Sequence, residues 1–244
     1  MKNDSEKRFI GRLTEEYHLV ALAYPHIEEF QSKVSSLAHE HLRTIQAGKV
    51  VEIGCGDGIT TDLLLNGLGV HELVAIDNEP KMVEQAKRNL GLIDRPQNFS
   101  VECADALAYL RTLEDTSVDV VATVWTLHNF LKEYRAQVVR EIVRVLRPGG
   151  LFVNGDKYAQ GPSTHAVALN QQLRRFFDAY LPLGKYDFLR DFVLHNVADE
   201  APDRLMTEAD SLSEVAEMGC RANVVYRNGM EGVLVAKKQL GQNE

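Results

Sequence analysis

The segment at residues 50–58 constrains this chain more than any other, because it places a glycine-rich loop after a short apolar run. Glycine recurs at every second position, at Gly54, Gly56 and Gly58, and a helical pattern follows from Ile59. Glycine has no Cβ, so the backbone can turn sharply after a strand and approach a ligand closely. The following helix directs its free N–H groups to the same place. The segment predicts a strand, a nucleotide-type cofactor loop and a helix.

The spacing of the small residues argues against a dinucleotide as the ligand. A dinucleotide-binding loop reads G-x-G-x-x-G/A, and its third small residue lets the helix pack closely on the strand. Counting from Gly54, that position is Ile59. Two carboxylates, Glu52 and Asp57, flank the glycines, which disfavours a pyrophosphate and favours a cation. An NAD-dependent oxidoreductase is therefore a disfavoured rival.

Two further acidic residues follow predicted strands. Asp77 ends the strand expected at residues 71–77, where an acid can bind both hydroxyls of a ribose. Asp105 follows the strand expected at residues 99–103 and precedes a helix expected at residues 106–111. The alternative for Asp105 is that it only caps this helix, which aspartate does well.

The rest of the chain predicts a doubly wound α/β fold. The next elements are a strand, a helix, a turn and a strand at residues 117–124, 132–146, 147–150 and 151–156. Five strands alternating with helices imply a parallel sheet with right-handed crossovers. A helix at residues 207–218 then leads to two strand-like runs, 221–226 and 232–237, and the Asn228 and Gly229 pair between them is a strong hairpin signal. We predict a Rossmann-like seven-stranded sheet with a terminal antiparallel hairpin.

These features together resemble the class I S-adenosylmethionine (SAM)-dependent methyltransferases over about residues 49–238. Motif I of that family reads E/D-x-G-x-G-x-G, as residues 52–58 do, and residues 146–150 resemble its turn before strand five. The resemblance implies a methyltransferase, a transferase with SAM as cofactor, in which an acid placed like Asp105 accepts a hydrogen bond from the adenine. The implied cofactor-binding residues are Glu52, Gly54, Cys55, Gly56, Gly58, Asp77, Asn78, Met82, Asp105, Ala106 and Trp125. For Met82, a place in the helix core is an equal alternative.

Two regions outside the common core are expected to determine the acceptor. Residues 9–46 predict two helices separated at Pro25, and these either fold over the cofactor as a lid or pack on the sheet edge. A helical insertion after strand five, at about residues 157–206, covers the crevice where a substrate must bind. We therefore expect an N-terminal helical lid at residues 1–48 and a SAM-binding domain at residues 49–244.

Methyl transfer is an in-line displacement, so positioning and exclusion of water can supply most of the acceleration. A general base is needed only where the acceptor loses a proton. His128 follows the fourth strand at the mouth of the expected pocket and is the candidate catalytic base, with a backbone hydrogen bond as the alternative role. The candidates for substrate contact are Tyr24, His26, Asp156, Tyr158 and Arg190. The sequence contains no evident metal cluster, so no metal is expected.

Three segments also resemble the carboxy-SAM synthase family, which serves tRNA wobble-uridine modification: residues 75–82, 126–130 and 232–238. That family makes a carboxylated sulfonium from SAM and prephenate, and an arginine before the last helix binds the new carboxylate. Here residues 190–206 depart from the pattern, with Arg190 and Arg204 as stand-ins. We rank a methyltransferase for a small-molecule acceptor first. A carboxy-SAM synthase-like or tRNA-modification enzyme and a non-catalytic SAM-fold partner protein are the alternatives.

The composition of the chain limits its number of domains, its compartment and its classes of binding partner. The 244 residues, 45% of them hydrophobic, suit one domain with modest additions. Three cysteines without a CxxC pair favour a reducing, cytoplasmic compartment. The net charge of −8 disfavours DNA but leaves room for a local tRNA-binding patch. No apolar run suits a bilayer and residues 1–8 are charged, so neither a membrane nor a signal peptide is expected. The N-terminal helices leave a homodimer open.

Overall fold

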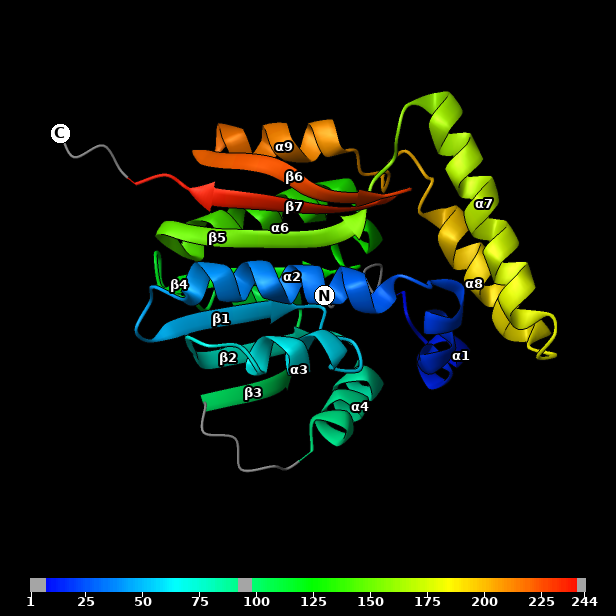
Figure 1. Cartoon of the computed structure of the whole chain (residues 1–244), viewed down its shortest axis with the longest axis horizontal. Helices are drawn as coiled ribbons and strands as arrows, with labels where there is room; N and C mark the ends of the chain where they lie inside the picture. Colours follow the sequence, from blue (N-terminus) through cyan, green and yellow to red (C-terminus); the bar gives the residue numbers. More distant parts are fainter. Residues whose placement is uncertain (1–7, 92–97, 241–244) are drawn as a thin grey trace.

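The computed structural model describes residues 8–91 and 98–240, so residues 1–7 of the charged N-terminal segment lie outside it. A seven-stranded sheet lies between two layers of helices (Figure 1). The strands are β1 (Gly48–Ile53), β2 (Val70–Asp77), β3 (Asn98–Cys103), β4 (Val118–Val124), β5 (Leu146–Lys157), β6 (Cys220–Asn228) and β7 (Glu231–Lys238). The predicted fold class is confirmed.

The sheet order is β3-β2-β1-β4-β5-β7-β6. The first five strands run parallel, with Val51 of β1 paired to Val74 of β2 and to Val121 of β4. Strand β7 runs antiparallel to both of its neighbours, so the antiparallel β6–β7 hairpin lies at one edge of the sheet, as expected. Strands β2 and β3 are added on one side of β1, and β4 and β5 follow on its other side. The point between β1 and β4 is thus a topological switch point, where ligands bind beyond the carboxyl ends of the strands.

The helices of the common core pack on both faces of the sheet. They are α2 (Ile27–Leu42), α3 (Ile59–Leu65), α4 (Pro80–Leu90), α5 (Ala106–Leu110), α6 (Lys132–Val145) and α9 (Glu208–Glu217), with a short 3-10 turn, η3 (Leu127–Asn129). On one face α2 buries Phe30, Val34, Ala38 and Leu42, which recur at a spacing of four. On the other face α5, α6 and α9 pack on the same sheet. Strand β5 begins at Leu146, earlier than predicted, because Leu146 already pairs with Val118 of β4.

The N-terminal region divides into two parts. Helix α2 packs on a face of the sheet and not on its edge, whereas α1 (Arg12–Glu15) and the 3-10 helix η2 (Tyr17–Ala23) lie at the strand ends (Figure 1). The boundary at residue 48 stays a prediction, because α2 belongs to the core of the sheet domain.

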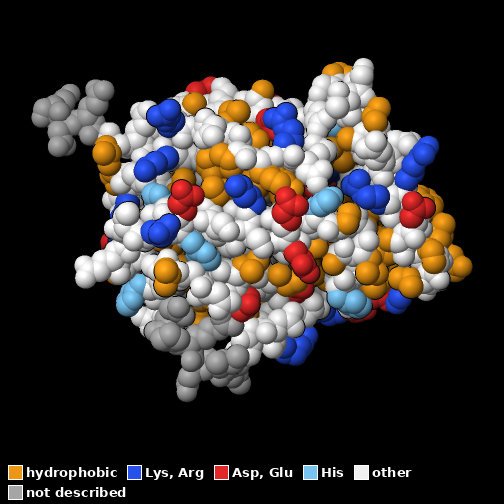
Figure 2. Space-filling model, viewed as in Figure 1, with side chains coloured by type: hydrophobic (Ala, Val, Ile, Leu, Met, Phe, Trp, Pro, Cys, Tyr) orange, Lys and Arg blue, Asp and Glu red, His pale blue; other side chains and the backbone are white. Residues whose placement is uncertain are grey.

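The insertion after β5 forms two helices, α7 (Pro162–Tyr180) and α8 (Tyr186–Ala198). With the N-terminal segment they build a third apolar cluster, in which the Tyr180 hydroxyl donates to the Leu19 carbonyl at 3.1 Å. Hydrophobic side chains also gather on the outer side of the insertion (Figure 2). Within the described part of the chain, each helix is too short or too polar to cross a membrane.

Candidate active site

The loop after β1 requires its glycines for conformation and for space. Gly54, Gly56 and Gly58 have φ values of 73°, 55° and 88°, in the left-handed region that favours glycine. A Cβ on Gly54 would lie only 2.2 Å from Oγ1 of Thr126. Gly58 forms the N-cap of α3. The loop therefore presents bare backbone toward the strand ends.

Asp77 fastens this loop to the end of β2. Its Oδ2 accepts from the N–H of Gly56 at 3.0 Å, and its Oδ1 accepts from the N–H of Glu79 at 2.9 Å. Burial raises the pKa of Asp77, while these backbone donors act in the opposite direction. Asp77 thus positions the loop and also lines the cavity in front of it.

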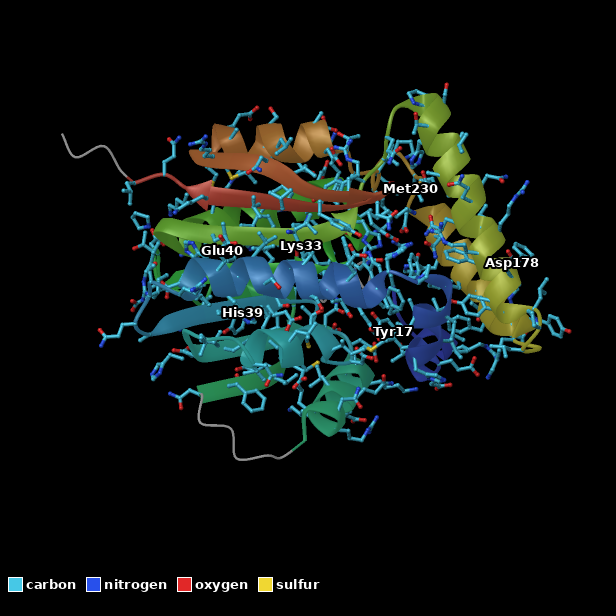
Figure 3. All side chains as sticks on the ribbon, viewed as in Figure 1. Tyr17, Lys33, His39, Glu40, Asp178 and Met230 are labelled. Atoms are coloured by element: carbon cyan, nitrogen blue, oxygen red, sulfur yellow. The ribbon has the colours of Figure 1, made fainter. Side chains whose placement is uncertain are left out.

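The space in front of the loop, which we call the loop cavity, has a volume of about 710 Å³ when the solvent at its open mouth is included. Seven of the predicted cofactor-binding residues line it: Gly54, Gly56, Asp77, Asn78, Met82, Ala106 and Trp125. The N-terminal segment closes one side with Phe9 and Tyr17, and Tyr17 lies near the loop (Figure 3). Burial, followed by the charges of Asp57 and Asp77, raises the pKa of Tyr17, so its hydroxyl stays neutral.

Glu52 and Cys55 lie beneath the loop instead of lining the cavity. The side chain of Glu52 is 1% exposed, and its Oε2 accepts from the Thr61 hydroxyl at 2.6 Å. Burial raises the pKa of Glu52 to about 7 and also raises the pKa of the Cys55 thiol. Their contacts support the loop from below.

Asp105 also lies outside the lining of the loop cavity. Its Oδ1 accepts from the N–H of Ala108 at 2.8 Å, which is the predicted cap of α5. Its Oδ2 accepts from the hydroxyl of Tyr134 at 2.7 Å, and Tyr134 itself lines the cavity. The capping alternative is therefore present in the structure, and a contact of Asp105 with adenine stays a prediction.

A second cavity, which we call the insertion cavity, adjoins the first and has a volume of about 1260 Å³ when the solvent at its open mouth is included. Phe9, Tyr17 and Trp125 line both cavities and so form a shared wall. Trp125 has a φ of 48°, which is uncommon for a side chain of this size and marks local strain. Its ring lies 4.7 Å from the ring of Tyr24 and stacks on Phe30 at 5.4 Å.

His128 lies at the insertion cavity and is held by a buried carboxylate. Its Nδ1 lies 2.5 Å from Oδ1 of Asp156, whose side chain is fully buried. Asp156 also accepts from the backbone N–H groups of Leu127 and Lys157, at 2.9 Å and 2.8 Å. This network fixes the ring orientation of His128 and leaves its Nε2 as the other polar atom.

Asp199 lies on the other side of the His128 ring, with its Oδ2 3.8 Å from Nε2. Arg8 and Lys157 also pair with Asp199. Burial would raise the pKa of Asp199, but His128 and Lys157 outweigh it and lower this pKa. Burial, with the nearby Arg8, lowers the pKa of His195 to about 3, so His195 is neutral.

Among the residues that the structure describes, the ligand atoms of His128, His195 and Asp199 lie within 4.8 Å of one another, as metal ligands do. However, Asp199 already pairs with Arg8 and Lys157. A divalent cation there would be repelled by both of these charges. The arrangement supports an electrostatic role for the cluster more strongly than a metal site.

The predicted substrate residues divide between the cavity and other places. Tyr24 and His26 line the insertion cavity, and Asp156 lies behind His128. Tyr158 is 1% exposed in the core, where its hydroxyl accepts from Asn154 at 2.7 Å, so it lines neither cavity. Arg190 also lines neither, because it is exposed on α8 and bonds to Asp191 at 2.7 Å. Neither residue can contact a ligand in these cavities as they stand.

Sequence reasoning did not identify several residues that line the cavities: Phe9, Tyr17, Asn129, Phe130, Tyr134, Gln172, Arg175, His195 and Glu231. Most of them lie on elements outside the glycine loop and its neighbouring strand ends. The helical spacing of Gln172 and Arg175, which places both on one face of α7, was the signal available for two of them.

Comparison with known proteins agrees with this geometry. Residues 51–154 match the family model described as a methyltransferase domain. A carboxy-S-adenosyl-L-methionine synthase from Shewanella loihica is 29% identical over 112 residues, which is 45% of this chain and 44% of that protein. The 27-O-demethylrifamycin SV methyltransferase from Amycolatopsis mediterranei is 31% identical over 120 residues, 46% of this chain and 40% of that protein. The chain thus spans less than half the length of these two relatives.

Among solved structures, an O-methyltransferase family protein from Burkholderia thailandensis is similar in fold, with a TM-score of 0.66 and 17% identity. The match covers 93% of this chain and 60% of that one. At this identity the likeness concerns the fold.

Proposed function

We propose that this chain, whose residues 51–154 match the family model described as a methyltransferase domain, is a SAM-dependent enzyme that transfers a methyl group to a small-molecule acceptor. The observation that carries the proposal is a pair of adjoining cavities with a common wall, one in front of the glycine loop and one beside His128. A cofactor and an acceptor held in these two cavities would meet at Trp125.

The loop cavity fits SAM on three counts. The left-handed glycines present backbone without side chains, and a Cβ on Gly56 would point at the Tyr17 hydroxyl, 3.5 Å away. Asp77 supplies a carboxylate, and Tyr17 and Trp125 supply aromatic faces that suit a positively charged ligand. Gly54, Gly56, Asp77 and Met82 would hold the cofactor. When bound, SAM supplies an electrophilic methyl group on a sulfonium.

His128 is proposed as the general base for an acceptor that loses a proton. Asp156 accepts from Nδ1, which leaves Nε2 with a lone pair for the acceptor's proton. Once Nε2 is protonated, the imidazolium lies between Asp156 and Asp199, and both carboxylates stabilise its charge. Asp156 is therefore a positioning residue, and His128 is the group that accepts the proton.

The N-terminal segment is proposed to exclude water from the reacting atoms. Phe9 and Tyr17 belong to the shared wall, and their rings contact edge to face with centroids 5.5 Å apart. Phe9 also packs on His195 at 4.4 Å, which ties the segment to α8. Arg8 anchors the same segment through Asp199 and the carbonyl of His195. Removing bulk water strengthens every electrostatic interaction within the site.

Native mass spectrometry of the purified chain, followed by denaturing analysis of any small molecule that it carries, tests this proposal. SAM or its demethylated product would support it. An empty protein that also fails to bind added SAM would refute it and favour a non-catalytic partner protein. For His128→Asn, we expect SAM binding to persist while turnover of an identified acceptor falls by about 10²-fold or more.

Carboxy-SAM synthesis is the second candidate, because relatives of that name match this chain. The stand-in arginines give it little support, since Arg190 is exposed and Arg204 bonds to the carbonyl of Asn129. The same experiment separates the two functions, because a bound molecule heavier than SAM by one carboxylate would favour the synthase. A tRNA acceptor stays an alternative, because the net charge of −8 argues against a broad basic surface but leaves room for a local tRNA-binding patch.

A further inference from the structure

The insertion cavity contains polar groups that the fold leaves without partners. Gln172 of α7 lines this cavity and is only 2% exposed. Its Nε2 donates to the hydroxyl of Tyr24 at 2.8 Å and to Oδ1 of Asn196 at 3.0 Å. Its Oε1 is buried and has no hydrogen-bond partner among the described residues. A buried acceptor without a donor costs free energy, so a ligand that donates to Oε1 would be favoured.

Arg175 lies one turn further along the same face of α7. Its Nε is buried and likewise lacks a partner, and within the described ranges its guanidinium forms no ion pair. Lys157, which also lines this cavity, differs from Arg175 because it pairs with Asp199 and Glu200. Arg175 thus lines the cavity as a cation that forms no ion pair among the described residues.

Glu231 supplies the opposite charge from the start of β7. It lines the same cavity, beside the β6–β7 turn where Met230 lies (Figure 3). Burial raises the pKa of Glu231, and the positive charges of Arg175 and His26 oppose this shift. The Arg175 and Glu231 charges are close enough to interact but form no ion pair within 4.0 Å in the described chain. Both side chains line the insertion cavity, so a ligand bound there can contact the two charges together.

We propose that the insertion cavity binds a zwitterionic small molecule, with a carboxylate on Arg175 and an ammonium group between Glu231 and the free oxygen of Gln172. An α-amino acid headgroup has this pair of charges. The Tyr24 hydroxyl, which accepts from Gln172, has its own hydrogen to donate to the carboxylate. This inference rests on the proposed function, because it assigns the headgroup of the acceptor.

The apolar body of the ligand is then expected to point toward the shared wall. The shared wall is aromatic, with Phe9, Tyr17 and Trp125. The charged headgroup would lie against α7 and the start of β7, whose residues Gln172, Arg175 and Glu231 line the insertion cavity and not the loop cavity. The reacting atom would consequently belong to the body of the molecule and not to its headgroup.

A matched set of probes tests the headgroup assignment by calorimetry, with the demethylated product of SAM present. Phenylalanine is compared with phenethylamine, which lacks the carboxylate, and with phenylpropanoate, which lacks the ammonium group. Leucine, isopentylamine and isocaproate form the aliphatic set. We expect one amino acid to bind at least about tenfold more tightly than both of its analogues. If either analogue binds as well as the amino acid in both sets, or if nothing binds, the proposal is wrong.

Two variants locate the charges. Arg175→Met should remove the preference for the amino acid over its amine, and Glu231→Gln should remove its preference over its acid. Arg174→Met is the matched control, since Arg174 is the exposed neighbour on the same helix. An equal loss in Arg174→Met and Arg175→Met would overturn the assignment. Binding of the demethylated SAM product is measured in parallel, because failure of that binding would refute the proposed function itself.

Discussion

The close contact between Gly54 and Thr126 allows a quantitative test of how the glycine loop is held. A Cβ on Gly54 would lie 2.2 Å from Oγ1, 2.5 Å from Cγ2 and 2.9 Å from Cβ of Thr126. Thr126 cannot move freely, because it is buried and its one hydroxyl hydrogen is shared between the carbonyls of Val124 and Ile53, which lie 3.0 Å and 3.1 Å from Oγ1. A methyl group at residue 54 must therefore displace a hydrogen-bonded side chain.

Two costs add in Gly54→Ala. Placing alanine at a φ of 73° costs ~1–2 kcal/mol. Displacing the Thr126 hydroxyl costs ~1 kcal/mol more. We expect the free energy of unfolding to fall by ~2–3 kcal/mol, which lowers Tm by ~5–10 °C in a chain of this size.

Gly149→Ala separates the two costs. Gly149 has a φ of 83°, but a Cβ at this position would meet only a side-chain carbon of Leu240, at 3.6 Å. This variant should lose only the conformational part, ~1–2 kcal/mol, and should bind the demethylated SAM product like the wild type. Thermal unfolding and calorimetry of both variants measure the difference. If Gly54→Ala is no less stable than Gly149→Ala and binds equally well, the packing of Thr126 does not hold the loop.

Three further predictions concern the site. The raised pKa of Glu52 means that, between the two pKa values, the folded protein keeps a proton that the unfolded chain releases. The free energy of unfolding is therefore highest below pH ~4.3 and falls by ~3 kcal/mol as the pH rises to about 7. Denaturant unfolding of Glu52→Gln at several pH values should not show this fall. Asp156→Asn should lower kcat by about 10²-fold and leave SAM binding intact, and an unchanged pH profile of kcat would contradict its role in positioning His128. Tyr17→Ala should weaken binding of the demethylated product by about tenfold, whereas Tyr17→Phe keeps the ring and should change it little by calorimetry.

The sheet could be predicted because its determinants are local. The glycine loop, the strand-end acids and the Asn228–Gly229 turn each act within a few residues, and the strands and hairpin appear where these signals indicate. The hydrogen-bond partners of Asp105 were less predictable, because its Oδ2 accepts from the hydroxyl of Tyr134, which lies on another helix 29 residues away in sequence. Sequence spacing cannot show which side chain reaches a carboxylate from a distant element.

The same limit explains why the predicted substrate-contact residues lie only in part at the cavities. Asp156 lies at the end of β5 and Tyr158 follows that strand directly, yet Asp156 contacts His128 while Tyr158 packs into the core. Gln172 and Arg175 became candidates only when the fold placed α7 against the N-terminal segment and the start of β7. Long-range packing therefore determines the acceptor side of the site, whereas local sequence determines the cofactor side.

The wall shared by the two cavities has a thermodynamic consequence. Phe9, Tyr17 and Trp125 line both cavities, so a shift of this wall that changes one cavity changes the other as well. Any factor by which the acceptor alters the affinity for the cofactor must equal the factor by which the cofactor alters the affinity for the acceptor. An acceptor that raises the affinity for the cofactor therefore binds more tightly to the protein–cofactor complex than to the free protein. The demethylated product of SAM would contact the same wall, so it would compete with SAM for the loop cavity most strongly at high acceptor concentration.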